Sequence, residues 1–178
     1  MNERRYLIVV DMQHDFIDAA LGTAEARDIV ERAAAYIRER RAQGYTVIGT
    51  LDTHGENYMA TREGRKLPVI HCIRGTEGWR LHPEIEKEIL GCTLVEKPTF
   101  GSVKLPEMIA EDMDADDRMT IELIGLCTDI CVVSNALLLK ARFPEAEIAV
   151  KADCCAGVTP SRHQAALETM ASCQIDII

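Results

Sequence analysis

Short apolar runs alternate with longer stretches of helical periodicity along this chain. Residues 23–42 place alanine and aliphatic side chains at helical spacing among Glu and Arg, and 129–141 and 160–172 also predict helices. We expect strands at 6–11, 46–52, 93–97, 119–125 and 146–153, and a last apolar run at the C-terminus. Nearly continuous apolar strands separated by helices are typical of a parallel sheet covered on both faces. The pattern therefore predicts an α/β fold with three layers.

The stretch from Thr53 to about Leu90 is an exception to this pattern. It holds four glycines, two prolines, the only Trp and three of the five histidines, without clear periodicity. A long irregular segment inside a compact domain is usually functional or disordered.

Composition narrows the class of protein. A chain of 178 residues with 47% hydrophobic and 28% charged residues fits one soluble domain over 1–178. A net charge of -9 argues against nucleic acid or an anionic membrane as the main partner, and no apolar run reaches the roughly 20 residues that span a bilayer. The first apolar run ends too soon for a secretory signal, so we expect a cytoplasmic protein. The acidic run at 111–117 is expected to be a solvated loop.

The seven cysteines are scattered and form no CxxC pair, which excludes zinc-ribbon and thioredoxin motifs. In a reducing compartment we expect free thiols, each by default a small buried hydrophobic side chain, with adjacent Cys154 and Cys155 as examples.

Polar residues gather where the predicted strands end. Asp11, Asp52, Lys97 and the segment GLCTDICV at 125–132 all lie at carboxyl ends of strands, the edge at which ligands bind in such sheets. Cys131 falls in the first turn of the next helix, with Thr128 or Asp129 available as N-cap, so we expect a lowered thiol pKa. Alternatively, the aspartate is only a cap and the lysine is solvated.

A second constellation suits a divalent metal ion. Asp52 and His54 are two residues apart, so on an extended strand they point to one side, and Glu63 and His71 follow. His, Asp and Glu donors fit zinc, and also manganese or iron. On spacing alone, the favoured interpretation is a strand-end cap with two surface histidines.

Three motifs carry a resemblance. VVDMQHDF at 9–16, EKPTF at 96–100 and IGLCTDICVVSNAL at 124–137 resemble the isochorismatase-like cysteine hydrolases, which include the nicotinamidases. The resemblance implies a doubly wound fold with a six-stranded, mainly parallel sheet. It implies Cys131 as nucleophile, Asp11 as acid and base, and Lys97 as the neighbouring cation. It also implies a cis peptide before Cys127 and an oxyanion hole made by the backbone N–H groups of Cys127 and Cys131.

The same resemblance extends to the metal ligands and the substrate. HCIRGT at 71–76 is similar to the nicotinamidase segment that opens with a metal histidine, which implies Asp52, His54 and His71 as ligands, with Glu63 as a fourth. In such enzymes the metal holds the pyridine nitrogen. Phe16 and Phe100 are the expected contacts to the ring, and the roles of Trp79, Tyr58 and His14 stay open. The family implies a homodimer or homotetramer.

We expect a cysteine amidase that converts nicotinamide to nicotinate and ammonia through a thioester. Hydrolysis of another small amide or ureide is the alternative within the family. Isochorismate hydrolysis and a non-catalytic binding protein are disfavoured, because the chain retains Asp11, Lys97 and Cys131 together.

Overall fold

The computed structural model of this protein describes residues 3–112 and 118–178, so most of the acidic run at 111–117 lies outside the described residues. Six strands form one sheet in the order β3-β2-β1-β4-β5-β6, and every pairing is parallel. The predicted strands are confirmed. They are β1 (Glu3–Val10), β2 (Thr46–Asp52), β3 (Thr93–Lys97), β4 (Arg118–Leu126), β5 (Glu147–Ala156) and β6 (Asp176–Ile177).

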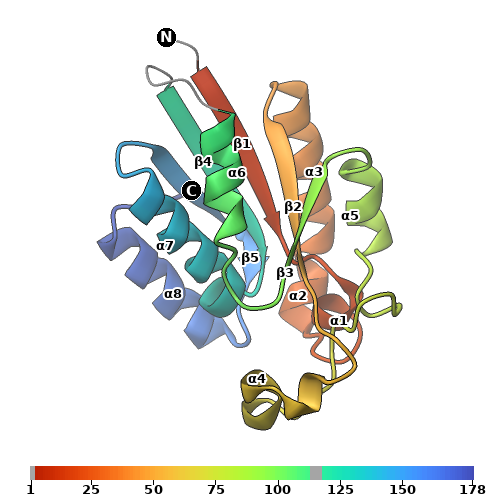
Figure 1. The fold of residues 1–178 in the computed structure, drawn as a ribbon. Coiled ribbons are helices and arrows are strands. Elements are labelled where there is room, and N and C mark those ends of the chain that lie inside the picture. Colours follow the sequence, from red (N-terminus) through yellow and green to blue (C-terminus); the bar gives the residue numbers. More distant parts are fainter. Residues whose placement is uncertain (1–2, 113–117) are drawn as a thin grey trace.

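Alternating side chains of the strands build two cores, one on each face of the sheet. Leu7 and Val9 of β1 belong to one apolar cluster, whereas Tyr6, Ile8 and Val10 belong to the other. Figure 1 shows α3 (Val30–Ala42) and α5 (Pro83–Glu88) on one face, and α6 (Lys104–Glu111), α7 (Val133–Arg142) and α8 (Pro160–Ser172) on the other. The three-layer, doubly wound prediction is therefore confirmed.

The predicted helices differ from the observed ones mainly at their starts. Residues 23–42 form two helices, α2 (Ala24–Asp28) and α3, and the Thr23 hydroxyl caps the first by accepting from the N–H of Ala26 at 3.0 Å. The segment after β4 begins with a π-helical turn, η2 (Thr128–Val132), and continues as α7. Wide turns of this kind are frequent at functional sites.

The irregular stretch 53–90 contains more structure than its sequence pattern indicated. It forms η1 (Tyr58–Ala60), α4 (Arg62–Lys66) and α5, and His54 and Ile73 make an isolated parallel bridge. In Figure 1, α4 lies beyond the carboxyl ends of the strands. The sequence pattern also missed α1 (His14–Ile17) and α6, since both are too short to establish a period. Among the described residues, no helix is long and apolar enough to cross a membrane.

The end of β4 packs unusually close to β1. Gly125 has a φ of 118°, and a side chain there would collide with the backbone of Val10. The next peptide bond, Leu126–Cys127, is cis, as the resemblance implied.

Candidate active site and metal centre

The three predicted catalytic residues meet in the interior of the protein. The Lys97 Nζ lies 2.6 Å from Asp11 Oδ2 and 3.4 Å from Cys131 Sγ. All three residues are buried, none with more than 3% of its surface exposed. Strand order explains the meeting: Asp11 follows β1, Lys97 ends β3, and Cys131 follows β4, which is next to β1.

The Asp11 carboxylate is fixed in place, but only one of its two oxygens accepts a directed hydrogen bond from the described residues. Its φ of 47° is a left-handed conformation that is uncommon for residues other than glycine. One carboxylate oxygen, Oδ1, accepts a hydrogen bond of 2.7 Å from the Thr50 hydroxyl. The other, Oδ2, makes the ion pair with Lys97 but receives no well-directed hydrogen bond from the described residues. Burial raises the pKa of Asp11 above its ordinary value, although Lys97 acts in the opposite direction. The carboxylate is therefore a base with an unfilled acceptor site.

Lys97 connects the two groups of predicted site residues. Besides Asp11 and Cys131, its Nζ donates to the Thr99 carbonyl at 3.1 Å and to Asp52 Oδ1 at 3.4 Å. Burial alone lowers the pKa of a lysine, but the negative charges of Asp11 and Asp52 outweigh it and raise the pKa of Lys97. Its ammonium group is consequently charged at any physiological pH.

The prediction of a lowered pKa for the Cys131 thiol is wrong for the protein without substrate. Complete burial and the Asp11 carboxylate raise the pKa of the Cys131 thiol well above its usual value, against the opposing effect of Lys97. The thiol is therefore neutral at rest, beside a carboxylate that can accept its proton.

The predicted N-cap is also wrong. Neither Thr128 nor Asp129 caps the turn that carries Cys131. The Thr128 hydroxyl lies 2.7 Å from His163 Nδ1, and Asp129 Oδ1 accepts from the N–H of Val158 at 2.9 Å. Both side chains fasten this turn to α8 and to the loop that precedes it.

The Cys127 backbone has the availability that an oxyanion hole requires. Its N–H group donates no hydrogen bond among the described residues. Burial raises the pKa of the Cys127 thiol to about 12, so its sulfur is not a competing thiolate. Both features agree with the interpretation that Cys127 contributes its backbone.

The four predicted metal ligands form one cluster. Asp52, His54, Glu63 and His71 each offer one donor atom, and these atoms all lie within 4.8 Å of one another. Asp52 Oδ2 lies 3.0 Å from His54 Nε2 and 3.5 Å from His71 Nε2, and Glu63 Oε1 lies 3.6 Å from His54 Nε2. Donors that share an ion at bond lengths of about 2.1 Å are separated by roughly 3–3.5 Å.

The surroundings of this cluster point its donors inward. His71 Nδ1 lies 2.8 Å from the Val69 carbonyl, an arrangement that leaves Nε2 free as an acceptor for a metal. Both histidines are buried, so the alternative interpretation as surface histidines is wrong. Two carboxylates beside two imidazoles suit a divalent cation with N/O preference. The residues present therefore fit a metal site.

Two further residues support the metal cluster: the sequence left the role of Tyr58 open, and it gave no prediction for Gln13. Tyr58 is completely buried, packs its ring 4.7 Å from that of His54 and 4.9 Å from that of His71, and donates to the Leu67 carbonyl. The Gln13 amide bonds to both the N–H and the carbonyl of Asp52. Gln13 lies two residues after Asp11 in the first motif, so its position was the available signal.

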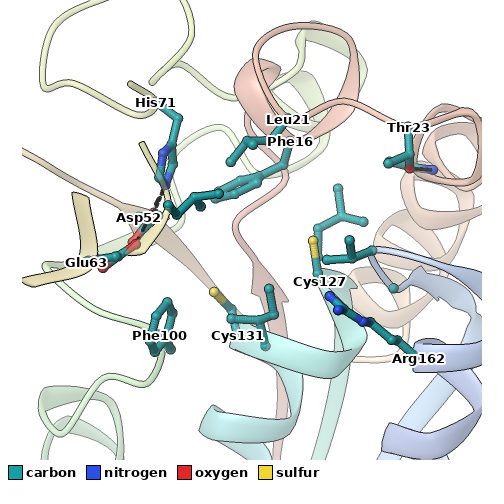
Figure 2. A pocket seen from close by; sticks show the side chains of 16 residues that line it. Phe16, Leu21, Thr23, Asp52, Glu63, His71, Phe100, Cys127, Cys131 and Arg162 are labelled. Atoms are coloured by element: carbon teal, nitrogen blue, oxygen red, sulfur yellow. Dashed lines mark hydrogen bonds and ion pairs between the residues drawn. The ribbon is translucent and has the colours of Figure 1, made fainter. Parts of the chain in front are cut away.

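A cavity of about 200 Å³ connects these groups. Figure 2 shows Asp52, Glu63 and His71 at one end, with Phe16 and Phe100 beside them and Cys131 facing the same space. Phe16 packs edge-on against His71, and Phe100 is 43% exposed. Both predicted ring contacts therefore line the cavity. Trp79 and His14 do not. The Trp79 indole donates to Thr53 Oγ1, and His14 Nδ1 lies 2.9 Å from Asp18.

Asn135 joins the two sides of the cavity and was also missed, although it lies one helical turn after Cys131. Its amide nitrogen donates to the carbonyls of Cys131 and Phe100, and its oxygen accepts from the N–H of Ser102. The loop carrying Phe100 is thereby fixed to the helix carrying Cys131.

Comparison with known proteins places this architecture in a family. The Isochorismatase domain model matches residues 5–178. The nicotinamidase/pyrazinamidase of Mycobacterium tuberculosis is 24% identical over 191 residues, covering 98% of each chain.

Solved structures agree with the family match. A pyrazinamidase of Pyrococcus horikoshii, crystallised in complex with zinc, superimposes with a TM-score of 0.82 at 26% identity and covers 100% of this chain and 99% of its own. An N-carbamoylsarcosine amidase of Thermoplasma acidophilum gives 0.75 at 26% identity, covering 99% and 95%. The chain belongs to the isochorismatase family and is a hydrolase related to the nicotinamidases and pyrazinamidases.

Proposed function

We propose that the protein hydrolyses a small carboxamide by cysteine catalysis, with nicotinamide as substrate and nicotinate and ammonia as products. One observation carries the proposal. Cys131, which is clustered with Asp11 and Lys97, lines a cavity that is also lined by three members of the metal group, Asp52, Glu63 and His71. The similarity to nicotinamidase/pyrazinamidase enzymes supports the choice of substrate.

The reaction begins with proton transfer. Because the Cys131 thiol is neutral at rest, Asp11 accepts its proton as the sulfur attacks the amide carbon. The new S–C bond converts the carbonyl oxygen to an oxyanion. Lys97 stays positively charged 3.4 Å from the sulfur and stabilises the negative charge that passes from Asp11 to the thiolate.

The second half releases the two products. The backbone N–H groups of Cys127 and Cys131 hold the oxyanion. In other enzymes, loss of one such donor raises the activation free energy by about 2.7–4 kcal/mol. Asp11 returns the proton to the departing ammonia as the C–N bond breaks, leaving a thioester on Cys131. Asp11 then takes a proton from water, which attacks the thioester. As the S–C bond breaks, Asp11 gives this proton to the sulfur, which regenerates the thiol and releases the acid product.

Asp52, His54 and His71, with Glu63 as a fourth ligand, would hold the divalent ion. Zinc is the expected ion, and manganese and iron suit the same donors. When bound, the ion supplies a coordination position for a substrate nitrogen and so orients the amide. Phe16 and Phe100 would contact the substrate ring.

A second candidate is hydrolysis of another small amide or ureide. It is favoured by the apolar lining of the cavity, which includes Leu21, Ala26 and Val158 in addition to the metal ligands. The similarity to an N-carbamoylsarcosine amidase agrees with this alternative.

We further propose that residues 1–178 act as one hydrolase domain in the cytoplasm, assembled as a homodimer or homotetramer. Light scattering on the purified protein measures the assembly, and a monomeric mass would contradict this part of the proposal.

The test is ammonia release from nicotinamide by purified protein, as isolated, after chelation and re-addition of zinc, and with Cys131→Ala. We expect release that falls at least tenfold on chelation, returns with zinc and disappears in the variant. Release that persists in Cys131→Ala would overturn the mechanism. No release from nicotinamide, with metal bound, would leave the second candidate.

A further inference from the structure

The cavity has a second cationic end that the proposed reaction does not use. Arg162, in the first turn of α8, is the only lysine or arginine among the residues that line the cavity. In Figure 2 its side chain extends toward Cys127 from the side opposite His71 and Glu63. The cavity therefore runs from the metal group, past Cys131, to a guanidinium.

This guanidinium has no partner of its own. Among the described residues, the Arg162 side chain makes no hydrogen bond or ion pair. Asp129 lines a neighbouring surface hollow together with Arg162, but the two form no ion pair, and Asp129 Oδ1 accepts from the N–H of Val158. Arg162 is exposed, so water hydrates its guanidinium and leaves it available to a ligand, whereas the largely buried guanidinium of Arg40 is paired with Glu122.

The position of Arg162 is unusual for a structural cation. The first turn of a helix carries the positive end of the helix dipole, where a basic side chain is disfavoured and an anion is favoured. The local structure of α8 needs only the Arg162 backbone, since the Thr159 side chain caps it by accepting the Arg162 N–H. The side chain is thus free to serve the cavity.

The lining of the cavity is mainly apolar. Leu126, Ile130 and Val158 contribute to it together with Cys131 and Arg162, and Thr23 is one of its few polar residues. An apolar channel that ends in an unpaired guanidinium fits a short hydrocarbon chain ending in a carboxylate, which guanidinium binds through charge-assisted hydrogen bonds.

We propose that Arg162 forms an anion subsite and that the preferred substrate is a small amide or ureide bearing a carboxylate. This inference rests on the proposed amidase function and favours its second candidate, another small amide or ureide, over nicotinamide. The amide carbon lies at Cys131 while the carboxylate reaches Arg162. Nicotinamide has a nitrogen for the metal end of the cavity but nothing for Arg162, so it is the poorer substrate.

The test compares amides of equal chain length with and without the charge. Succinamate and glutaramate carry the carboxylate, and butyramide and valeramide do not. We expect wild-type protein to have a higher kcat/KM for the anionic member of each pair. In Arg162→Ala the ratio of anionic to neutral kcat/KM should fall about tenfold, a modest loss because solvent reaches this ion pair and limits its strength. Arg162→Lys should recover part of the ratio.

Arg118→Ala is the matched control for charge. Arg118 is exposed, has no ion pair among the described residues and begins β4, at the opposite end of that strand from Cys131. Its removal should leave the ratio unchanged. A ratio that Arg162→Ala also leaves unchanged would overturn the inference, as would turnover of nicotinamide alone by the wild type.

Binding separates this inference from the proposed reaction. In the Cys131→Ala background, calorimetric titration with succinamate should show binding that is weakened about tenfold by adding Arg162→Ala. If no amide is hydrolysed but this difference appears, the amidase function fails and the anion subsite stands. If the wild-type protein hydrolyses amides and Arg162→Ala does not weaken the binding of succinamate, the amidase function stands and the anion subsite fails.

Discussion

Two clusters of buried charge occupy this sheet, and they are satisfied to different degrees. In the middle of β4, both carboxylate oxygens of Glu122 have partners: Oε2 accepts from Tyr36 at 2.7 Å and Arg40 at 2.6 Å, and Oε1 accepts from Tyr45 at 3.1 Å. At the carboxyl edge, Asp11 accepts one directed hydrogen bond from the described residues, at Oδ1, and its second oxygen makes an ion pair with the ammonium of Lys97.

The difference separates a structural network from a reactive one. A buried carboxylate whose acceptor sites are filled is stable as an anion and has no capacity for a further proton donor. Asp11 keeps an acceptor site in a dry environment, which raises its pKa and prepares it to take a proton from Cys131. The first cluster should therefore control stability, and the second should control chemistry.

The largest expected effect is on the reactive cluster. Cys131→Ala should lower kcat by about 10⁴-fold or more, because no other group supplies the nucleophile, while changing the free energy of unfolding by no more than roughly 1 kcal/mol. Steady-state kinetics and urea denaturation measure the two quantities. Cys127→Ala keeps its backbone N–H, so it should lose less than about tenfold. Equal losses from the two variants would contradict the assignment of Cys131.

The next effect concerns the structural cluster. Glu122→Ala should lower the free energy of unfolding by about 3–5 kcal/mol, since it leaves the partly buried Arg40 without its charge partner. The kcat of the protein that remains folded should not change. Exposed Glu147, at the start of β5, is the control, and its replacement by Ala should stay within about 0.5 kcal/mol. A large loss of kcat in folded Glu122→Ala would contradict the view that the Glu122 cluster controls stability and not chemistry.

The smallest effect is a shift along the pH axis. Asp11 must be ionised to accept the thiol proton, so kcat/KM should fall as pH decreases through the raised pKa of Asp11. The Thr50 hydrogen bond stabilises the ionised form. Thr50→Val should therefore raise that pKa further and move the acidic limb upward by roughly one pH unit. A pH–rate profile measures the shift, and a limb that moves downward would exclude Asp11 as the base.

Much of this arrangement could be predicted from sequence, because strand ends are local features. Asp11, Asp52 and Lys97 each follow or end an apolar run, and parallel strands bring their carboxyl ends to one edge. The register of β2 and β3 even makes Asp52 and Lys97 direct neighbours. These positions needed no knowledge of long-range packing.

What failed depended on contacts between distant segments. Thr128 and Asp129 were expected to cap a helix, but their side chains bind His163 and Val158 about 30 residues later. The Cys131 thiol was expected to be acidic from the helix dipole, yet complete burial outweighs that effect. The role of Tyr58 stayed open and Arg162 gave no local signal, because the surroundings of both residues are built by other elements.

The strand order also has a consequence for folding. Lys97 and Cys131 are 34 residues apart, and they meet Asp11 only when β3, β2, β1 and β4 have paired side by side. Parallel pairs close long loops before they gain contacts, which makes such sheets slow to form. Helical circular dichroism should therefore recover before activity when the protein refolds from urea. Regain of activity would then report completion of the sheet.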